Sequence, residues 1–159
     1  MKIDNITLAL FTWDGIPATQ YGQHTGQFSG QSQLGLLTIG TDDGAEGHAF
    51  LGASSRGGHL DAQSLIDHLK PQLMGQDPLD REWLNREMHK RSRATTLRAI
   101  GAMDVALWDI GGKVAGLPIH QLLGSARSSL SAYASSPTLG SAEAYVEEAL
   151  SIKAAGWAA

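Results

Sequence analysis

The chain has 159 residues, 42% hydrophobic and 18% charged, a balance typical of a globular protein and not of a disordered or membrane protein. Its 16 acidic residues outnumber its 12 basic ones, and the net charge of −4 argues against nucleic-acid or anionic-membrane partners. The absence of cysteine excludes disulfides and thiolate metal sites, and Asp4 lies where a signal peptide would be apolar, so we expect a cytoplasmic protein.

Three apolar segments in the first third of the chain predict a three-stranded antiparallel meander. Residues 3–13 alternate between apolar and polar, and the apolar runs 34–39 and 45–51 flank a turn at 40–44. Asp43-Gly44 supplies the residues that a tight hairpin needs.

The connection between the first two predicted strands, residues 15–33, has an unusual composition. It contains five glutamines, four glycines and no Asp, Glu, Lys or Arg. A polar segment of this length cannot be core, and long irregular loops in compact domains are more often functional than short ones. We therefore expect a long irregular loop that acts as a lid.

Helical periodicity follows the third strand. Leucines at i, i+4 and i+8 predict a helix over 61–73, bent or split by Pro71, and Asp77-Pro78 predicts the start of a second helix. Apolar residues three and four apart predict a third helix over 93–115, which Gly116 ends.

The hydrophobic periodicity changes in the last part of the chain, which predicts a strand at 130–135 and a helix between Ser141 and Gly156. A single parallel strand with one helix has two unpaired edges, so we expect this unit to begin a longer βαβ series in a longer protein. The predicted domains are 1–125, an α+β domain of meander and helical bundle, and 126–159, the first β/α unit of a barrel.

Two sequence segments carry a family resemblance. AIGAMDVALWDIGGK (99–113) resembles the signature segment of the mandelate racemase and muconate lactonizing group of the enolase superfamily, and GLPIHQLLG (116–124) resembles its exit from the capping domain. The resemblance implies an N-terminal capping domain followed by the beginning of a (β/α) TIM-type barrel, whose catalytic face is the C-terminal end of the strands.

The resemblance also implies a chemistry. Enzymes of this group hold Mg²⁺ on three acidic residues, and a Lys or His base removes the proton next to the substrate carboxylate. The family's lysine motif follows a Gly-aromatic pair, here Gly156-Trp157, so the expected lysine and the metal ligands lie beyond Ala159. No catalytic residue and no metal ligand is assigned in this chain, which we do not expect to be active alone.

Substrate contacts are nevertheless expected from two loops and one strand end. The segment 15–33 resembles the capping-domain loop that closes over the barrel mouth, and 51–58 resembles a second such loop. The candidate substrate-binding residues are Tyr21, His24, Gln27, Arg56, Ser135 and Ser136. His24 could equally be an exposed loop histidine, and Arg56 an ordinary surface arginine.

The favoured function is that of an acid-sugar dehydratase with a small carboxylate substrate, because the lid is rich in amides and hydroxyls. A racemase, epimerase or cycloisomerase of the same family is the alternative, as is a non-catalytic capping-domain remnant that acts as a binding module. The full-length protein is expected to be a homo-oligomer without nucleic-acid or membrane partners.

Overall fold

The computed structural model describes residues 1–20 and 26–157, which form two compact units. The first unit comprises Met1–Asp14 and Gln31–Ser125, and the second comprises Gly15–Gly30 and Ala126–Ala159. The division of the chain into a capping domain and a barrel unit remains a prediction.

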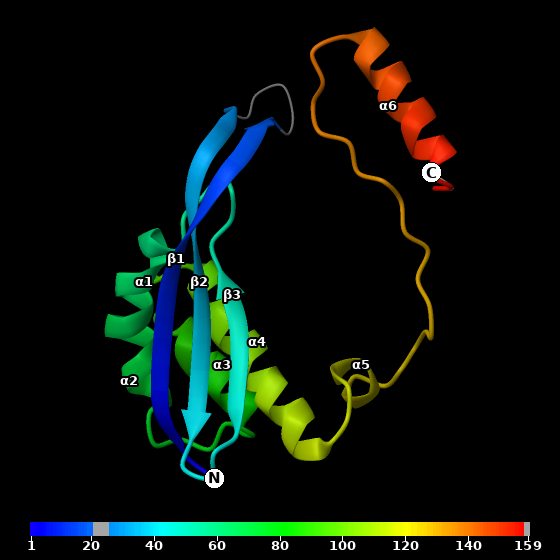
Figure 1. The fold of residues 1–159 in the computed structure, drawn as a ribbon. Helices are drawn as coiled ribbons and strands as arrows, with labels where there is room; N and C mark the ends of the chain where they lie inside the picture. Colours follow the sequence, from blue (N-terminus) through cyan, green and yellow to red (C-terminus); the bar gives the residue numbers. More distant parts are fainter. Residues whose placement is uncertain (21–25, 158–159) are drawn as a thin grey trace. The chain divides into compact units, whose positions relative to one another are not determined.

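The predicted meander is confirmed. Strands β1 (Ile3–Thr19), β2 (Phe28–Thr41) and β3 (Glu46–Leu51) form a sheet in the order β1-β2-β3 (Figure 1). Strands β2 and β3 are antiparallel, with Thr38 opposite His48. Gly44 closes their turn with a φ of 87°, which glycine adopts without steric cost.

The prediction of one irregular loop over 15–33 is wrong, because strands occupy most of it. β1 continues to Thr19 and β2 begins at Phe28. Backbone hydrogen bonds can pair two strands whatever their side chains, so the polar composition hid this extension.

The first predicted helix is one helical run in three parts: α1 (His59–Ser64), the π-helical turn η1 (Leu65–Leu69) and α2 (Lys70–Leu73). The interruption comes just before Pro71, which has no N–H for the ordinary helical bond. The Lys70 N–H bonds to the Leu65 carbonyl, five residues back, as in a π-turn.

The next two helices begin later than predicted. α3 (Arg81–His89) starts after a turn in which the Asp77 carboxylate accepts from the Leu79 N–H at 2.9 Å. α4 (Leu97–Ala115) starts after Thr96, whose hydroxyl accepts from the Ala99 N–H at 3.2 Å. Gly116 ends α4 with a φ of 65°, as predicted, and the short helix α5 (Ile119–Leu122) follows.

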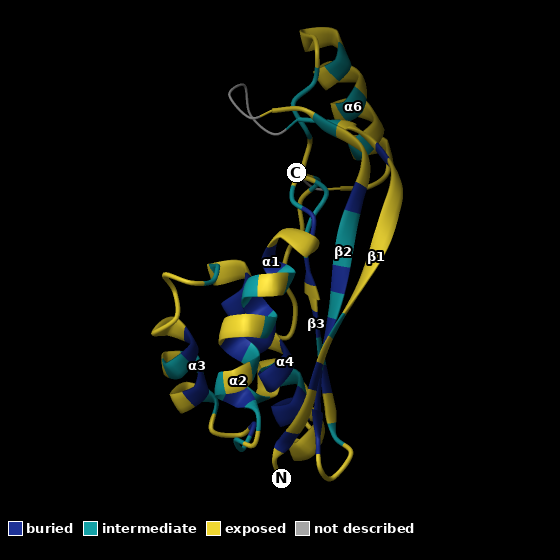
Figure 2. Cartoon of the chain, turned by 90° about the vertical axis from the view of Figure 1, so that its left-hand side faces the viewer, coloured by how far each residue is buried: buried dark blue, intermediate teal, exposed yellow. Residues whose placement is uncertain are grey.

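The core of the first unit lies between one face of the sheet and helices α1 to α4 (Figure 2). Fully buried side chains come from every layer, including Ile6, Leu37, Leu69, Leu84 and Met103. Burial of such side chains is the main favourable contribution to folding.

Helix α4 packs against β3 at Gly47. A Cβ atom at this position would lie 2.0 Å from the Ala106 carbonyl oxygen, so only glycine allows the approach. From α4, Asp109 accepts the His48 N–H at 2.8 Å, and the Lys113 ammonium donates to the Glu46 carbonyl at 2.8 Å. Asp109 and Lys113 also pair with each other.

The free edge of β1 is covered near its start. The Ile3 N–H bonds to the Gln76 carbonyl at 2.9 Å, and the Gly75 N–H bonds to the Ile3 carbonyl at 2.8 Å. The Lys70 ammonium donates to the Ile6 carbonyl at 2.8 Å.

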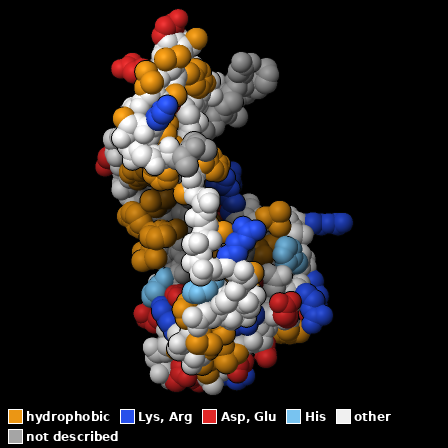
Figure 3. All heavy atoms as spheres, turned by 90° about the vertical axis from the view of Figure 1, so that its right-hand side faces the viewer, with side chains coloured by type: hydrophobic (Ala, Val, Ile, Leu, Met, Phe, Trp, Pro, Cys, Tyr) orange, Lys and Arg blue, Asp and Glu red, His pale blue; other side chains and the backbone are white. Residues whose placement is uncertain are grey.

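The second unit contains α6 (Ala142–Ala154), capped as predicted by Ser141, whose hydroxyl accepts from the Ala144 N–H. The strand predicted at 130–135 is wrong, because this segment carries no assigned strand. A parallel strand needs a neighbour, and the described part of the chain offers it none. Helix α6 has no buried residue, and hydrophobic side chains including Val146 and Leu150 remain at its surface (Figure 3).

Within residues 1–20 and 26–157, no helix combines the length and apolarity that crossing a bilayer requires.

Candidate functional site

The loop at 52–58, between β3 and α1, is tied to β2 at both ends. The Ser32 hydroxyl donates to the Ala53 carbonyl at 2.7 Å, and the Gly58 N–H donates to the Gln33 carbonyl at 2.7 Å. Within the loop, Ala53 and Arg56 exchange two backbone hydrogen bonds. The loop is therefore a fixed part of the first unit.

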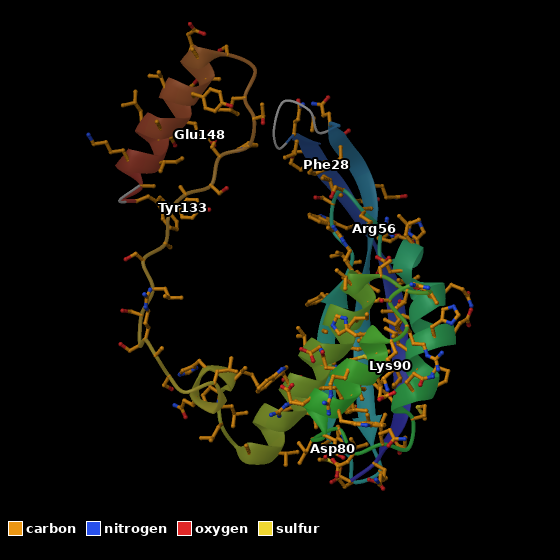
Figure 4. All side chains as sticks on the ribbon, turned by 180° about the vertical axis from the view of Figure 1, so that it is seen from behind. Phe28, Arg56, Asp80, Lys90, Tyr133 and Glu148 are labelled. Atoms are coloured by element: carbon orange, nitrogen blue, oxygen red, sulfur yellow. The ribbon has the colours of Figure 1, made fainter. Side chains whose placement is uncertain are left out.

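Arg56 projects from this loop and pairs with Asp61 of α1 (Figure 4). Its Nε and Nη2 atoms donate to the two carboxylate oxygens at 3.2 and 2.8 Å. The Asp61 side chain is fully buried, whereas the Arg56 side chain is 39% exposed. Such a two-pronged pair fixes the orientation of the guanidinium.

The ion pair perturbs both groups. The hydrogen bond from Arg56 lowers the pKa of Asp61 despite the opposing effect of burial, and Thr96 and Arg98 lower it further. The same hydrogen bond raises the pKa of Arg56. Both groups are charged at neutral pH, so the guanidinium is already neutralised within the chain.

A polar cavity of about 530 Å³ lies between the loop and β2. Its lining residues are Gln31, Ser32, Gln33, Ser54, Ser55, Arg56, Gly57, His59 and Leu60. The side chains of Gln33, Ser54, Ser55 and His59 have no hydrogen-bond partner among the described residues. The cavity thus offers free amide, hydroxyl and imidazole groups to a polar ligand.

The structure places the predicted contacts differently. Arg56 lines this cavity, and Gln27 is exposed just before β2. Tyr21 and His24 lie outside the described residues. In the second unit Ser135 is exposed, and the Ser136 hydroxyl donates to the carboxylate of Glu148 on α6 (Figure 4).

Sequence reasoning missed most of the cavity. Gln31 and Gln33 were assigned to an irregular loop, although their spacing of two is that of side chains on one face of a strand. His59 was not singled out, because its position beside Gly57 depends on the fold of the loop. A strand reading of 28–33 would have revealed the two glutamines.

A second cavity, of about 480 Å³, is mainly apolar. It is lined by His48, Val105, Trp108, Asp109, Ile119 and Leu123. Its polar groups are engaged: the His48 ring bonds to the Thr38 hydroxyl, and the Arg81 guanidinium lies 3.8 Å above the Trp108 ring. Burial would raise the pKa of Asp109, but hydrogen bonds from Lys113 and the His48 N–H outweigh it and lower this pKa. These contacts serve packing.

Residues 1–20 and 26–157 contain no group of three His, Asp or Glu side chains that could hold a metal ion. The described residues therefore do not fit a magnesium site. What the first unit provides is a preformed polar cavity beside a neutralised arginine.

Comparison with known proteins places this geometry in context. The sequence model described as "Mandelate racemase / muconate lactonizing enzyme, N-terminal domain" matches residues 17–124. A D-galactonate dehydratase family member of Pseudarthrobacter chlorophenolicus is 42% identical, over 61% of this chain and 25% of its own length. A D-mannonate dehydratase of Caulobacter vibrioides is 38% identical, over 77% of this chain and 31% of its own.

Solved structures of the enolase superfamily have a similar fold. An enolase-superfamily member from Polaromonas sp. JS666 has a TM-score of 0.81 at 26% identity, covering 98% of this chain and 42% of its own. D-glucarate dehydratase from Agrobacterium tumefaciens, complexed with magnesium, has a TM-score of 0.68 at 26% identity, covering 86% of this chain and 36% of its own. The chain spans a quarter to a third of the length of the galactonate and mannonate dehydratase relatives.

Proposed function

The chain belongs to the mandelate racemase and muconate lactonizing enzyme family, and on this premise we propose that it is the substrate-recognising capping part of a magnesium-dependent acid-sugar dehydratase. The whole protein would remove the proton next to a substrate carboxylate and expel the hydroxyl of the adjacent carbon, so that the elements of water leave together. The cytoplasm is the proposed compartment.

The structural observation that supports a sugar acid is the polar cavity of the first unit. Its unengaged groups on Gln33, Ser54, Ser55 and His59 match the alternating donors and acceptors of a polyhydroxylated chain. An apolar substrate would leave these groups unpaired, which costs binding free energy. The names of the galactonate and mannonate dehydratase relatives support the same class.

In this proposal the residues of this chain bind and orient the substrate. The proposed substrate contacts stay Gln27, Arg56, Ser135 and Ser136, with Tyr21 and His24. Magnesium would act as a Lewis acid that stabilises the charge developing on the carboxylate, and its ligands would come from other residues of the whole protein, since the described residues do not fit it. The glucarate dehydratase neighbour was solved with magnesium, which supports this cofactor.

The experiment is a substrate screen on the protein encoded by the complete reading frame. Sugar monoacids and diacids are incubated with Mg²⁺ or with EDTA, and the 2-keto product is measured by its semicarbazone absorbance. We expect a 2-keto product that requires Mg²⁺, and no product from the 159-residue chain alone.

The same screen separates the alternatives. Exchange of the α-proton in D₂O without a keto product would replace the dehydratase by a racemase or epimerase. Isomerisation of a lactone or a muconate would indicate a cycloisomerase. No Mg²⁺-dependent change in any acid would leave the binding-module alternative.

A further inference from the structure

We propose that the bond between Asp14 and Gly15 is a modification site, at which the chain cyclises without an enzyme to a succinimide and reopens as isoaspartate. The chain contains two Asp-Gly pairs, Asp14-Gly15 and Asp43-Gly44, and no Asn-Gly pair. Glycine favours this cyclisation because it has no Cβ atom to hinder attack by its own nitrogen. All four residues are exposed, so access of water does not distinguish the two pairs. The contacts around each pair do.

The reaction needs no reagent other than water. The Gly15 nitrogen bonds to Cγ of Asp14, and the carboxyl hydroxyl leaves as water with the N–H proton. A second water then breaks one of the two C–N bonds of the ring. Cleavage at Cγ restores aspartate, whereas cleavage at the main-chain carbonyl leaves the chain linked through Cγ, which is isoaspartate. No atom is oxidised or reduced, and the neutral carboxyl is the form that reacts.

The Asp43-Gly44 pair is held in an unreactive arrangement. The Thr41 hydroxyl donates to Oδ1 of Asp43 at 2.6 Å, and the Ala45 N–H donates to the same atom at 3.4 Å. The bond from Thr41 lowers the pKa of Asp43 most, so little of the neutral carboxyl is present at neutral pH. The attacking nitrogen is engaged as well, because the Gly44 N–H donates to the Thr41 carbonyl at 2.9 Å. Cyclisation here must break the turn.

The Asp14-Gly15 pair is held less firmly. Among the described residues, the Asp14 carboxylate accepts one hydrogen bond, from the exposed Gln31 amide at 2.6 Å. Gly15 adopts a φ of 70° inside β1, a conformation typical of a β-bulge, where the ladder is locally interrupted. The boundary between the two compact units also falls between residues 14 and 15, and backbone at such a boundary opens at lower cost than core backbone. Residue 14 is therefore freer to cyclise than residue 43.

Isoaspartate at residue 14 would change β1 itself. It inserts one methylene into the main chain and moves the carboxylate onto Cα, away from the Gln31 amide. The backbone groups of β1 beyond Gly15 are then displaced along β2, so the ladder bonds of 15–19 must re-form in a new register or be lost. The modification is thus a slow change in the polar extension of β1.

The test is an ageing experiment on the folded 159-residue chain in neutral buffer. Samples taken over several weeks are digested with endoproteinase Asp-N, which cuts before aspartate and not before isoaspartate, and electron-transfer fragmentation locates the modified residue. We expect isoaspartate to accumulate at residue 14 at least about fivefold faster than at residue 43, the factor that the loss of roughly one hydrogen bond implies. An equal or faster rate at residue 43, or no isoaspartate at residue 14, would overturn the proposal.

The same measurement in concentrated urea shows whether the fold causes the difference. Unfolding removes the hydrogen bonds of both Asp-Gly pairs, so the two rates should become similar. A difference of the same size in urea would mean that the neighbouring residues in the sequence select residue 14, and it would refute the structural argument.

Variants test the protection directly. Thr41→Val removes the hydroxyl that holds Asp43 and is expected to raise the rate of isoaspartate formation at residue 43. Thr38→Val removes another hydroxyl of β2 and should leave that rate unchanged. Asp14→Glu keeps the charge but cannot form the five-membered ring, so the signal at residue 14 should disappear. An unchanged rate at residue 43 in Thr41→Val would contradict the protection assigned to Thr41.

Discussion

Replacing Gly47 with alanine tests the close approach of β3 and α4. The new Cβ atom would lie 2.0 Å from the Ala106 carbonyl oxygen and 2.7 Å from Cγ1 of Ile110, whereas an ordinary contact begins at 3.4 Å. The first clash is with backbone, so a side-chain rotation cannot relieve it. The helix must retreat from the strand by more than an ångström.

The cost can be worked from what that retreat disrupts. Overpacking a core contact costs about 1–3 kcal/mol. The Asp109–His48 and Lys113–Glu46 bonds, both 2.8 Å long, would stretch as well, at roughly 0.5–1.5 kcal/mol each. We expect the free energy of unfolding to fall by about 2–6 kcal/mol, which at an m-value of roughly 2 kcal/mol/M lowers the urea midpoint by about 1–3 M.

Urea unfolding followed by circular dichroism at 222 nm measures this change, with Gly101→Ala as the matched control. Gly101 lies on an exposed turn of α4, and a Cβ atom there would have nothing within 4 Å. That variant should be more stable by about 0.5–1 kcal/mol, because alanine loses less backbone entropy in a helix. A Gly47→Ala variant with an unchanged or higher midpoint would refute the packing described for this junction.

Three further predictions concern single contacts. Thr96→Ala should lower the free energy of unfolding by about 1–2 kcal/mol, since it removes the N-cap of α4; thermal unfolding checks it, with Thr96→Ser expected to retain most of the cap. Asp109→Ala should accelerate hydrogen exchange at the His48 amide more than at other amides of the sheet, because it removes the acceptor of the His48 N–H. Hydrogen exchange followed by NMR checks this, and an equal acceleration at all amides of the sheet would contradict the role of Asp109 in protecting His48. The pKa of Asp61 and that of Asp109 are both depressed on folding, so their contribution to stability is present above their ordinary pKa near 4 and is lost as pH falls through the folded values. Urea midpoints measured from pH 7 down to pH 2 should therefore fall below about pH 4, and Asp109→Asn should flatten that fall.

Residue patterns predicted the elements that bury apolar side chains. The meander followed from alternation and from Asp43-Gly44, and α4 from its spacing of three and four with Gly116 at its end. Each of these signals has a direct physical cause in periodicity or in a positive φ. Helix starts were less accurate, because Thr96 and Asp77 each decide locally whether a turn becomes a helix.

The polar parts of β1 and β2 and the polar cavity beside β2 could not be predicted in the same way. The extension of β1 to Thr19 and of β2 back to Phe28 depends on backbone pairing, which leaves no hydrophobic pattern. The partner of Arg56 depends on how the loop folds back toward α1, and five residues of separation gave no sign that Asp61 would be buried. The unpaired segment at 130–135 shows the reverse case, where alternation was present but a neighbouring strand was not.

The cover on the two outer strands has a consequence for self-association. An open sheet edge is a template on which another chain can add a strand and start aggregation. Here side chains and a neighbouring turn satisfy several of those backbone groups: Lys70 and Gln76 beside β1, Asp109 and Lys113 beside β3. These bonds oppose the addition of a fourth strand. Removal of Lys70, Asp109 or Lys113 would free a backbone group on an outer strand and so favour pairing of the sheet with another chain.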